Sequence, residues 1–299
     1  MKSAKYPYAR PYVRDSDIKA VSKVLKNQYL TEGSEILNFE SNISSKTGAK
    51  YTIACNSGTA ALHLLYKSIG LKKNDTILTS PITFIATANA AKMCGANVIF
   101  ADVDPVTGLL TSETIEKKII EHKKKIKAVV VVHLGGRVCD MLAISKVAKK
   151  YACLLLEDAC HAIGAIYKTS KVKKYVGSCK YSLASTFSFH AIKNITTAEG
   201  GCITTNNYEI YKKIKLLRSH HLERNIKKIS KLPERNAKWY YEAKEVGWNY
   251  RLNELSSALG NSQIKYLEFN IKKRNQLAKY YNRYLKGNEY IIRPKLENN

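Results

Sequence analysis

The sequence lacks three features that would argue against a cytoplasmic protein. Its longest apolar runs, such as residues 128–134, are too short to cross a bilayer. It does not open with a charged stretch followed by an apolar segment, so we expect no signal peptide. None of its seven cysteines forms a C-x-x-C pair, which favours reduced thiols over a disulfide framework or a zinc site. We therefore expect a cytoplasmic protein with no membrane segment and no bound metal.

Acidic residues are also scarce. The chain has 24 of them against 50 lysines and arginines, which gives a formal net charge of +26. Such an excess can indicate binding to nucleic acid or to a membrane surface. Here the lysines are spread along the whole chain, and no zinc finger, RNP-like aromatic strand or Arg-rich helix accompanies them. We therefore expect no nucleic-acid partner, although the positive field would attract an anionic substrate such as a nucleotide-linked sugar.

From residue 50 the sequence alternates short β-rich runs with helical ones. The predicted strands are 51–55, 76–80, 97–104, 127–134 and 153–159, and the predicted helices between them are 60–69, 84–93, 113–122 and 141–151. Several of these strands are apolar on both faces, so the pattern predicts an α/β domain whose mainly parallel sheet is covered by helices on both sides. Ligands of such sheets bind at the carboxyl ends of the strands.

Further helices are predicted on either side of this region. Residues 15–27 form a predicted helix with Asp15 as its N-cap, and a second amphipathic helix carries Ile36, Phe39 and Ile43. After residue 201 we expect a helix over 207–219, a charged surface excursion over 220–245, helices over 254–264 and 265–286, and a last segment, 290–294, that could be a strand.

One stretch, residues 182–201, predicts a strand, a short polar loop and a second strand after Gly200-Gly201. The loop carries Lys193 among small, apolar and hydroxyl residues, whereas many other lysines of the chain lie in charged runs. Beside a buried strand end an ammonium group is poorly solvated, so the free amine is favoured and can act as a nucleophile. Lys193 is therefore a candidate Schiff-base lysine, and the alternative is an ordinary loop lysine.

Three other strand ends carry groups that suit the same chemistry. Residues 56–60 join a strand to a helix N-terminus through small residues, which is typical of an anion site and equally of a simple N-cap. Asp158 ends a buried strand and needs a partner, either a protonated pyridine nitrogen or a structural group. Phe84 either lies against a planar ring or packs in the core, and His161 either bonds a cofactor oxygen or is a core histidine. Together these groups predict a pyridoxal phosphate site.

Five segments carry a resemblance to a known family, namely NSGTAALHL, SPITFIATANAA, LLEDACHAIGA, TFSFHAIKNITTAEGG and GWNYRLNELSSALG. In these segments the sequence resembles the DegT/DnrJ/EryC1/StrS sugar aminotransferase family. Members of this family are fold-type I pyridoxal phosphate enzymes. The resemblance runs from the first helix to about residue 286. It implies an aspartate-aminotransferase-like fold with a large domain and a truncated small C-terminal domain. The implied boundaries are 1–33 for an N-terminal helix and substrate loop, 34–245 for the pyridoxal phosphate-binding large domain, and 246–299 for linker helices and the start of the small domain.

The resemblance also implies residue roles. Lys193 would form the Schiff base and move the proton, and Asp158 would keep the pyridine nitrogen protonated. Phe84 would stack on the ring, and His161 would lie near its phenolic oxygen. The phosphate would be held by Ser57, Gly58, Thr59 and Ser188, with Asn249 reaching the phosphate of the neighbouring subunit in a homodimer. The sugar would contact Tyr8, Gln28, Tyr29, Leu30 and Thr31.

The implied function is transfer of an amino group from glutamate to the C4 keto group of a UDP-linked 4-keto-6-deoxy-N-acetylhexosamine. The segments SFHAIK, ITTAEGG and LLRSH most resemble the branch of the family that acts in this way on the route to pseudaminic acid, a component of surface polysaccharides. The alternatives are a related enzyme for a dTDP- or GDP-linked sugar or for C3, an inactive shortened relative, and a basic α/β protein that is not an enzyme. A dehydrating relative carries histidine at the lysine position, so Lys193 argues against that activity.

Overall fold

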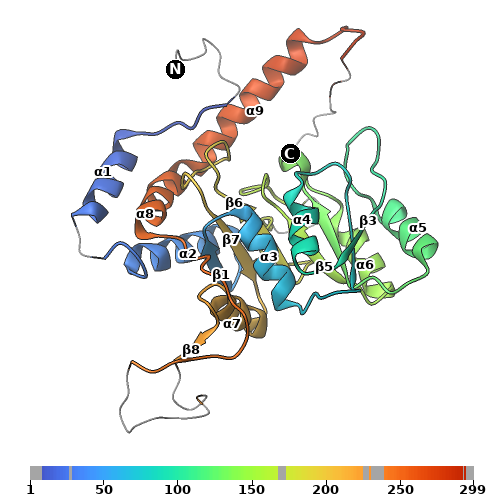
Figure 1. The fold of residues 1–299 in the computed structure, drawn as a ribbon. Helices are drawn as coiled ribbons and strands as arrows, with labels where there is room; N and C mark the ends of the chain where they lie inside the picture. Colours follow the sequence, from blue (N-terminus) through green and yellow to red (C-terminus); the bar gives the residue numbers. More distant parts are fainter. Residues whose placement is uncertain are drawn as a thin grey trace.

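A seven-stranded sheet forms the centre of the computed structural model, which describes residues 9–26, 29–167, 173–224, 229, 239–291 and 293 (Figure 1). The strand order is β1-β7-β6-β5-β4-β2-β3. Of these seven strands only β7 runs against the others, because both of its pairings, with β1 and with β6, are antiparallel. The strands are β1 (Tyr51–Cys55), β2 (Thr76–Thr79), β3 (Asn97–Phe100), β4 (Ala128–Val132), β5 (Leu154–Asp158), β6 (Ala184–Ser188) and β7 (Gly201–Thr205).

Helices cover both faces of this sheet, which confirms the predicted α/β class. All five residues of β4 are buried, and the first four alternate between two apolar cores. Val129 and Val131 face one core with helices α2 (Ser34–Thr47), α5 (Ser112–His122) and α6 (Met141–Lys150). The other core holds α3 (Gly58–Ser68), α4 (Ala86–Met93) and α7 (Tyr208–Leu217).

The remaining elements lie outside the two cores. They are α1 (Asp15–Leu25), α8 (Glu254–Gln263), α9 (Leu267–Tyr284), the 3-10 turns η1 (Leu134–Gly136) and η3 (Ile264–Tyr266), and a short ribbon of β8 (Leu222–Glu223) with β9 (Glu242–Ala243). Helix α9 follows α8 and extends away from the sheet (Figure 1). No helix in the described part of the chain combines the length and the apolar character that a membrane span needs.

The element boundaries differ from the predicted ones at several ends. Arg14, and not Asp15, is the N-cap of α1, because Arg14 is extended and its N–H donates to the side chain of Asp17 (2.9 Å). The strand predicted over 97–104 ends at residue 100, because the Asp104 side chain accepts the Thr107 N–H (2.7 Å) and closes a turn. Residues 290, 291 and 293 belong to no strand, and the rest of the predicted segment 290–294 lies outside the described residues.

Glu254, the first residue of α8, caps the distant helix α2. Its carboxylate accepts hydrogen bonds from the N–H groups of Glu35 (2.7 Å) and Ile36 (3.3 Å), which have no partner within α2. The N–H of Glu254 donates to the Leu30 carbonyl (3.0 Å). A Cβ on Gly33 would lie 2.7 Å from this carboxylate, so a side chain there would have to displace Glu254 from its capping position. The loop before α2 is thereby joined to the C-terminal helices.

Candidate active site

A cavity of about 350 Å³ lies at the carboxyl ends of the parallel strands, where such sheets bind ligands. It faces α3 and α4 and is lined by residues at or just after the ends of β1, β2, β4, β5 and β6. Its lining residues are Ser57, Gly58, Thr59, Leu62, Thr83, Phe84, Ala86, Val132, Asp158, Cys160, His161, Ser188, His190, Ile192, Lys193 and Glu199.

The wall that follows β1 is the N-terminus of α3. Ser57 is the N-cap, and its hydroxyl accepts the Ala60 N–H (3.0 Å). The N–H groups of Gly58 and Thr59 have no intrahelical partner and lie at the positive end of the helix dipole. A Cβ on Gly58 would lie 2.9 Å from the Cβ of Ser188, so the absence of a side chain lets the turn approach β6. The result is an anion-binding corner with hydroxyl groups beside it.

The base of the cavity is Asp158, the last residue of β5, which is 6% exposed. Its carboxylate accepts the Thr87 hydroxyl on α4 (2.7 Å) and the Cys160 N–H (3.2 Å). Burial and the Asp158 charge raise the pKa of the Cys160 thiol well above its usual range, so this thiol stays protonated. Asp158 is therefore a buried carboxylate with two protein donors and an open side toward the cavity.

Lys193 and His161 reach the cavity from neighbouring loops. The Lys193 N–H donates to the His190 carbonyl (3.0 Å), which forms a turn after β6. The His161 Nδ1 accepts the Gly135 N–H (3.3 Å), so the proton of the neutral ring is on Nε2. Burial and the charge of Lys193 lower the pKa of His161, against an opposing effect of Asp158. His161 is thus a neutral hydrogen-bond donor at physiological pH.

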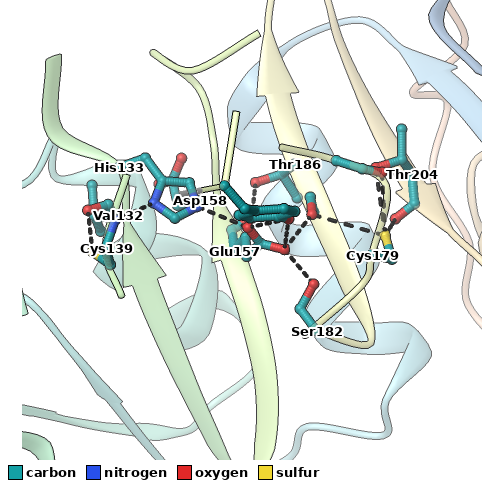
Figure 2. Close-up of polar contacts among 12 residues, drawn as sticks. Val132, His133, Cys139, Glu157, Asp158, Cys179, Ser182, Thr186 and Thr204 are labelled. Atoms are coloured by element: carbon teal, nitrogen blue, oxygen red, sulfur yellow. Dashed lines mark hydrogen bonds and ion pairs between the residues drawn. The ribbon is translucent and has the colours of Figure 1, made fainter. Parts of the chain in front are cut away.

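The neighbouring acid, Glu157, lies on the other face of β5 and takes no part in the cavity. Figure 2 shows its carboxylate between the His133 ring (2.8 Å) and the Ser182 hydroxyl. The Tyr167 hydroxyl (2.8 and 2.9 Å) and the Ser185 hydroxyl (2.9 Å) also donate to it. The side chains of Glu157 and His133 are both fully buried. Glu157 therefore serves the fold, as a structural carboxylate with several side-chain partners.

The charge state of this buried pair follows from opposing effects. Burial raises the pKa of Glu157, but its hydrogen bonds and the charge of His133 outweigh this and leave it lowered. Burial lowers the pKa of His133, while contacts with Cys139 and Glu157 raise it to about 10. The Cys139 N–H points at the His133 Nδ1 (3.3 Å), which favours a neutral ring. The shorter, charge-assisted contact with the carboxylate is the stronger effect, so the raised pKa prevails.

The cavity brings together most of the predicted cofactor site. Eight of those residues line it, namely Ser57, Gly58, Thr59, Phe84, Asp158, His161, Ser188 and Lys193. Asn249 does not line it. This residue is exposed and pairs with Ser219 in an isolated bridge. Of the residues predicted to contact the sugar, Tyr29, Leu30 and Thr31 precede α2 and are outside the lining, and Tyr8 and Gln28 lie outside the described residues.

Sequence reasoning missed several residues of the site. Thr87 holds the Asp158 carboxylate, and its place three residues after Phe84, in a helical stretch, was the available signal. His190 and Glu199 line the cavity and approach each other to 3.7 Å, although both lie inside the lysine motif. Contacts between separate segments of the chain leave no periodic pattern in a sequence, so the fold alone reveals them.

Comparison with known proteins gives a consistent result. The model of the DegT/DnrJ/EryC1/StrS aminotransferase family matches residues 11–299. A UDP-4-amino-4,6-dideoxy-N-acetyl-beta-L-altrosamine transaminase of Campylobacter jejuni is 39% identical over 290 residues, which are 97% of this chain and 72% of the relative. The GDP-perosamine synthase of Caulobacter vibrioides is 35% identical over 249 residues, or 83% of this chain and 61% of the relative.

The fold agrees with these sequence matches. The structure of Helicobacter pylori PseC, an aminotransferase involved in the biosynthesis of pseudoaminic acid, superposes with a TM-score of 0.84 at 37% identity, over 96% of this chain and 72% of that one. These findings confirm the predicted family and fold type. The chain belongs to the DegT/DnrJ/EryC1/StrS aminotransferase family.

Proposed function

We propose that this protein is a pyridoxal phosphate-dependent aminotransferase that moves an amino group from glutamate to the keto group of a nucleotide-linked sugar. The observation that carries the proposal is one cavity that joins Lys193, Asp158 and the N-terminus of α3. The names of the Campylobacter and Helicobacter relatives support a UDP-linked 4-keto-6-deoxy-N-acetylhexosamine as the sugar. An assay with UDP-, dTDP- and GDP-linked keto-sugars would distinguish this substrate from that of the GDP-perosamine synthase relative.

The residues present fit the cofactor. A phosphate group suits the N–H groups of Gly58 and Thr59 and the hydroxyls beside them. The Asp158 carboxylate, which accepts the Thr87 hydroxyl and the Cys160 N–H and also lines the cavity, suits a protonated ring nitrogen. Phe84 is 70% exposed on the cavity wall and offers a flat face to a ring. When bound, the cofactor supplies an aldehyde and an electron-accepting ring.

The chain's own residues then have distinct tasks. Asp158 would hold a proton on the ring nitrogen, and the hydrogen bond from Thr87 orients its carboxylate. The Lys193 amine accepts and returns a proton at the reacting carbon, as a general base and acid. The neutral His161 donates from Nε2 to an oxygen in the cavity. Leu62, Val132 and Ile192 line the same space and exclude water from it.

Replacement of Lys193 by alanine tests the proposal. The variant should bind pyridoxal phosphate without a covalent bond, give no borohydride-trapped adduct by mass spectrometry and show no amino transfer. The exposed Lys180 provides the matched control, because Lys180→Ala removes the same charge away from the cavity. Amino transfer retained in Lys193→Ala, or an adduct at another lysine, would refute the assignment.

We also propose a homodimer in which Asn249 of each subunit serves the cavity of the other. The supporting observation is that Asn249 is exposed and is absent from the lining of its own subunit's cavity. Mixing Lys193→Ala chains with Asn249→Ala chains tests the idea, because a mixed dimer would contain one intact shared site. Recovery of activity on mixing is expected, and a monomer on gel filtration would contradict it.

The domain division is a further proposal, with boundaries as the sequence suggests. Residues 34–245 hold the central sheet and the cavity walls, so they form the large domain. Residues 246–299 include α8 and α9, and residues 1–33 include α1 and the loop proposed to contact the sugar.

We also propose a cytoplasmic location for the protein. All seven cysteines are free thiols, which supports this location. The domain boundary has a test of its own. Limited proteolysis should cut near residue 245 before it cuts the sheet.

A further inference from the structure

Helix α9 holds three successive backbone carbonyls of the Lys193 loop, defined as residues 189–200. Arg274 Nη2 donates to the carbonyls of Ile192 (2.8 Å) and Lys193 (2.9 Å). Asn270 Nδ2 donates to the carbonyl of the next residue, Asn194 (2.9 Å). Asn270 and Arg274 are four residues apart, so they lie on the same side of α9, one turn apart. The backbone on both sides of the Lys193 side chain is thus held from one direction.

The helix that makes these contacts is itself anchored. Leu267, at the start of α9, is buried in a core, and Ile271 packs against the same core. Asn270 also accepts a hydrogen bond from Arg14 (3.1 Å), whose guanidinium lies over the ring of Tyr266 (4.0 Å). These contacts fix α9 to the N-terminal segment and to the large domain. A fixed helix can position a loop, whereas a loose one could not.

Besides the contacts with α9, the Lys193 loop is held by its own backbone bonds and by Asn194 Nδ2, which donates to the Ile163 carbonyl (3.3 Å). Two cavities flank it in addition to the one described above, with volumes of about 310 and 550 Å³. Both are lined by Lys193, Asn194 and Arg274. Side-chain packing therefore leaves space beside the loop, and Lys193 and Arg274, which are in contact, lie on the wall that the two cavities share. Loss of the Arg274 contacts would free the backbone that carries Lys193.

We propose that Arg274, assisted by Asn270, is a positioning residue that presents the Lys193 amine to the cofactor cavity. The guanidinium suits this task because it is always charged, has several donors in a rigid plane and can bridge two adjacent carbonyls. The proposal rests on the function proposed above for Lys193. The competing role for Arg274 is direct binding of an anionic group of the sugar substrate, since the residue also lines both flanking cavities.

The first test uses cofactor-free protein and does not depend on the proposed function. Amide hydrogen exchange of residues 190–198, followed by mass spectrometry, reports the hydrogen bonds of Lys193 N–H and Thr197 N–H. Arg274→Gln should speed this exchange about tenfold, as expected for the loss of roughly one charge-assisted hydrogen bond. Arg283→Gln is the matched control, because it makes the same change about 13 Å further along α9. Unchanged exchange in Arg274→Gln would overturn the proposal.

The second test separates positioning from substrate binding. Arg274→Gln should slow covalent attachment of pyridoxal phosphate to Lys193 about tenfold, because a misplaced nucleophile reacts slowly. The non-covalent affinity, compared in Lys193→Ala and in Lys193→Ala/Arg274→Gln, should be the same, and Arg274→Lys should recover only part of the attachment rate, because an ammonium group lacks the rigid plane of donors. An unchanged rate combined with a raised KM for the sugar alone would overturn positioning in favour of substrate binding.

The same data distinguish a failure of the proposed function from a failure of the positioning role. If wild-type protein forms no adduct at Lys193 while exchange still responds to Arg274→Gln, the pyridoxal phosphate assignment is wrong and the contact between α9 and the loop stands. If the adduct forms at the same rate in wild type and in Arg274→Gln, the assignment stands and the positioning role is wrong.

Discussion

Glu157 and Asp158 are adjacent on β5, yet their side chains meet opposite environments. Successive residues of a strand point to opposite faces, so Glu157 enters the core with α2, α5 and α6, and Asp158 faces α4 and the cavity. The Glu157 carboxylate receives hydrogen bonds from four side chains. Asp158 receives one from a side chain and one from the backbone. A buried acid whose bonds are complete serves the fold, whereas one that faces a cavity with an open side is available for chemistry.

Asp158→Asn should give the largest effect and should act on function. The amide cannot hold a proton on a ring nitrogen, so we expect kcat/KM for amino transfer to fall by about a thousandfold, as for loss of a key electrostatic group. The free energy of unfolding should fall by only about 1 kcal/mol, because Thr87 can still donate to the amide oxygen while the Cys160 N–H loses its acceptor. Steady-state kinetics measure kcat/KM, and urea unfolding of the same preparation measures the free energy of unfolding. Near-normal turnover would remove Asp158 from the mechanism.

Glu157→Gln should show the reverse pattern. The change breaks a fully buried charged pair with His133 and leaves too few lone pairs for the surrounding donors. We expect the free energy of unfolding to fall by about 3 kcal/mol, as is typical when one partner of a buried pair is lost. Residual folded protein should keep its kcat. The comparison between the two acids fails if this variant is stable and inactive.

The pH dependence of stability sharpens the same contrast. The folded-state pKa of His133 is raised to about 10 from an ordinary value of 6.5. Its protonation therefore contributes stability that is fully present below pH 6.5 and is lost as the pH rises toward 10. Wild-type protein should lose unfolding free energy over this range, and His133→Gln should lose less. Urea unfolding at four or five pH values tests this, and parallel curves for the two proteins would contradict the charged pair.

The smallest effects should come from two hydroxyl deletions. Thr87→Val removes the side-chain donor to Asp158 and should lower kcat/KM about threefold to tenfold, with little effect on stability. Tyr167→Phe removes a donor to Glu157 and should cost about 1 kcal/mol of unfolding free energy, with kcat unchanged. The two variants delete the same group on opposite faces of β5, so each serves as the control for the other.

Much of this architecture follows from local sequence. The alternation of apolar runs with helical periods predicted the parallel sheet, and the residues at strand ends together with the family resemblance predicted eight members of the cavity. What could not be predicted depends on contacts between distant segments. Nothing near His133 indicates that its partner is Glu157, and nothing near Lys193 indicates that Arg274, 81 residues later, holds its carbonyl. The N-cap of α1 was missed for a local reason, because Arg14 is an unusual capping residue.

The junction between Gly33 and Glu254 has a consequence for anyone who redesigns the substrate range. Randomising Tyr29, Leu30 and Thr31 is structurally permissible, because all three residues are exposed and Leu30 is held through its backbone carbonyl. Gly33 should be kept fixed in any such library, since a side chain there would displace the carboxylate that caps α2. A loop transplanted from a relative should therefore be transferred together with its counterpart of Glu254, as a matched pair.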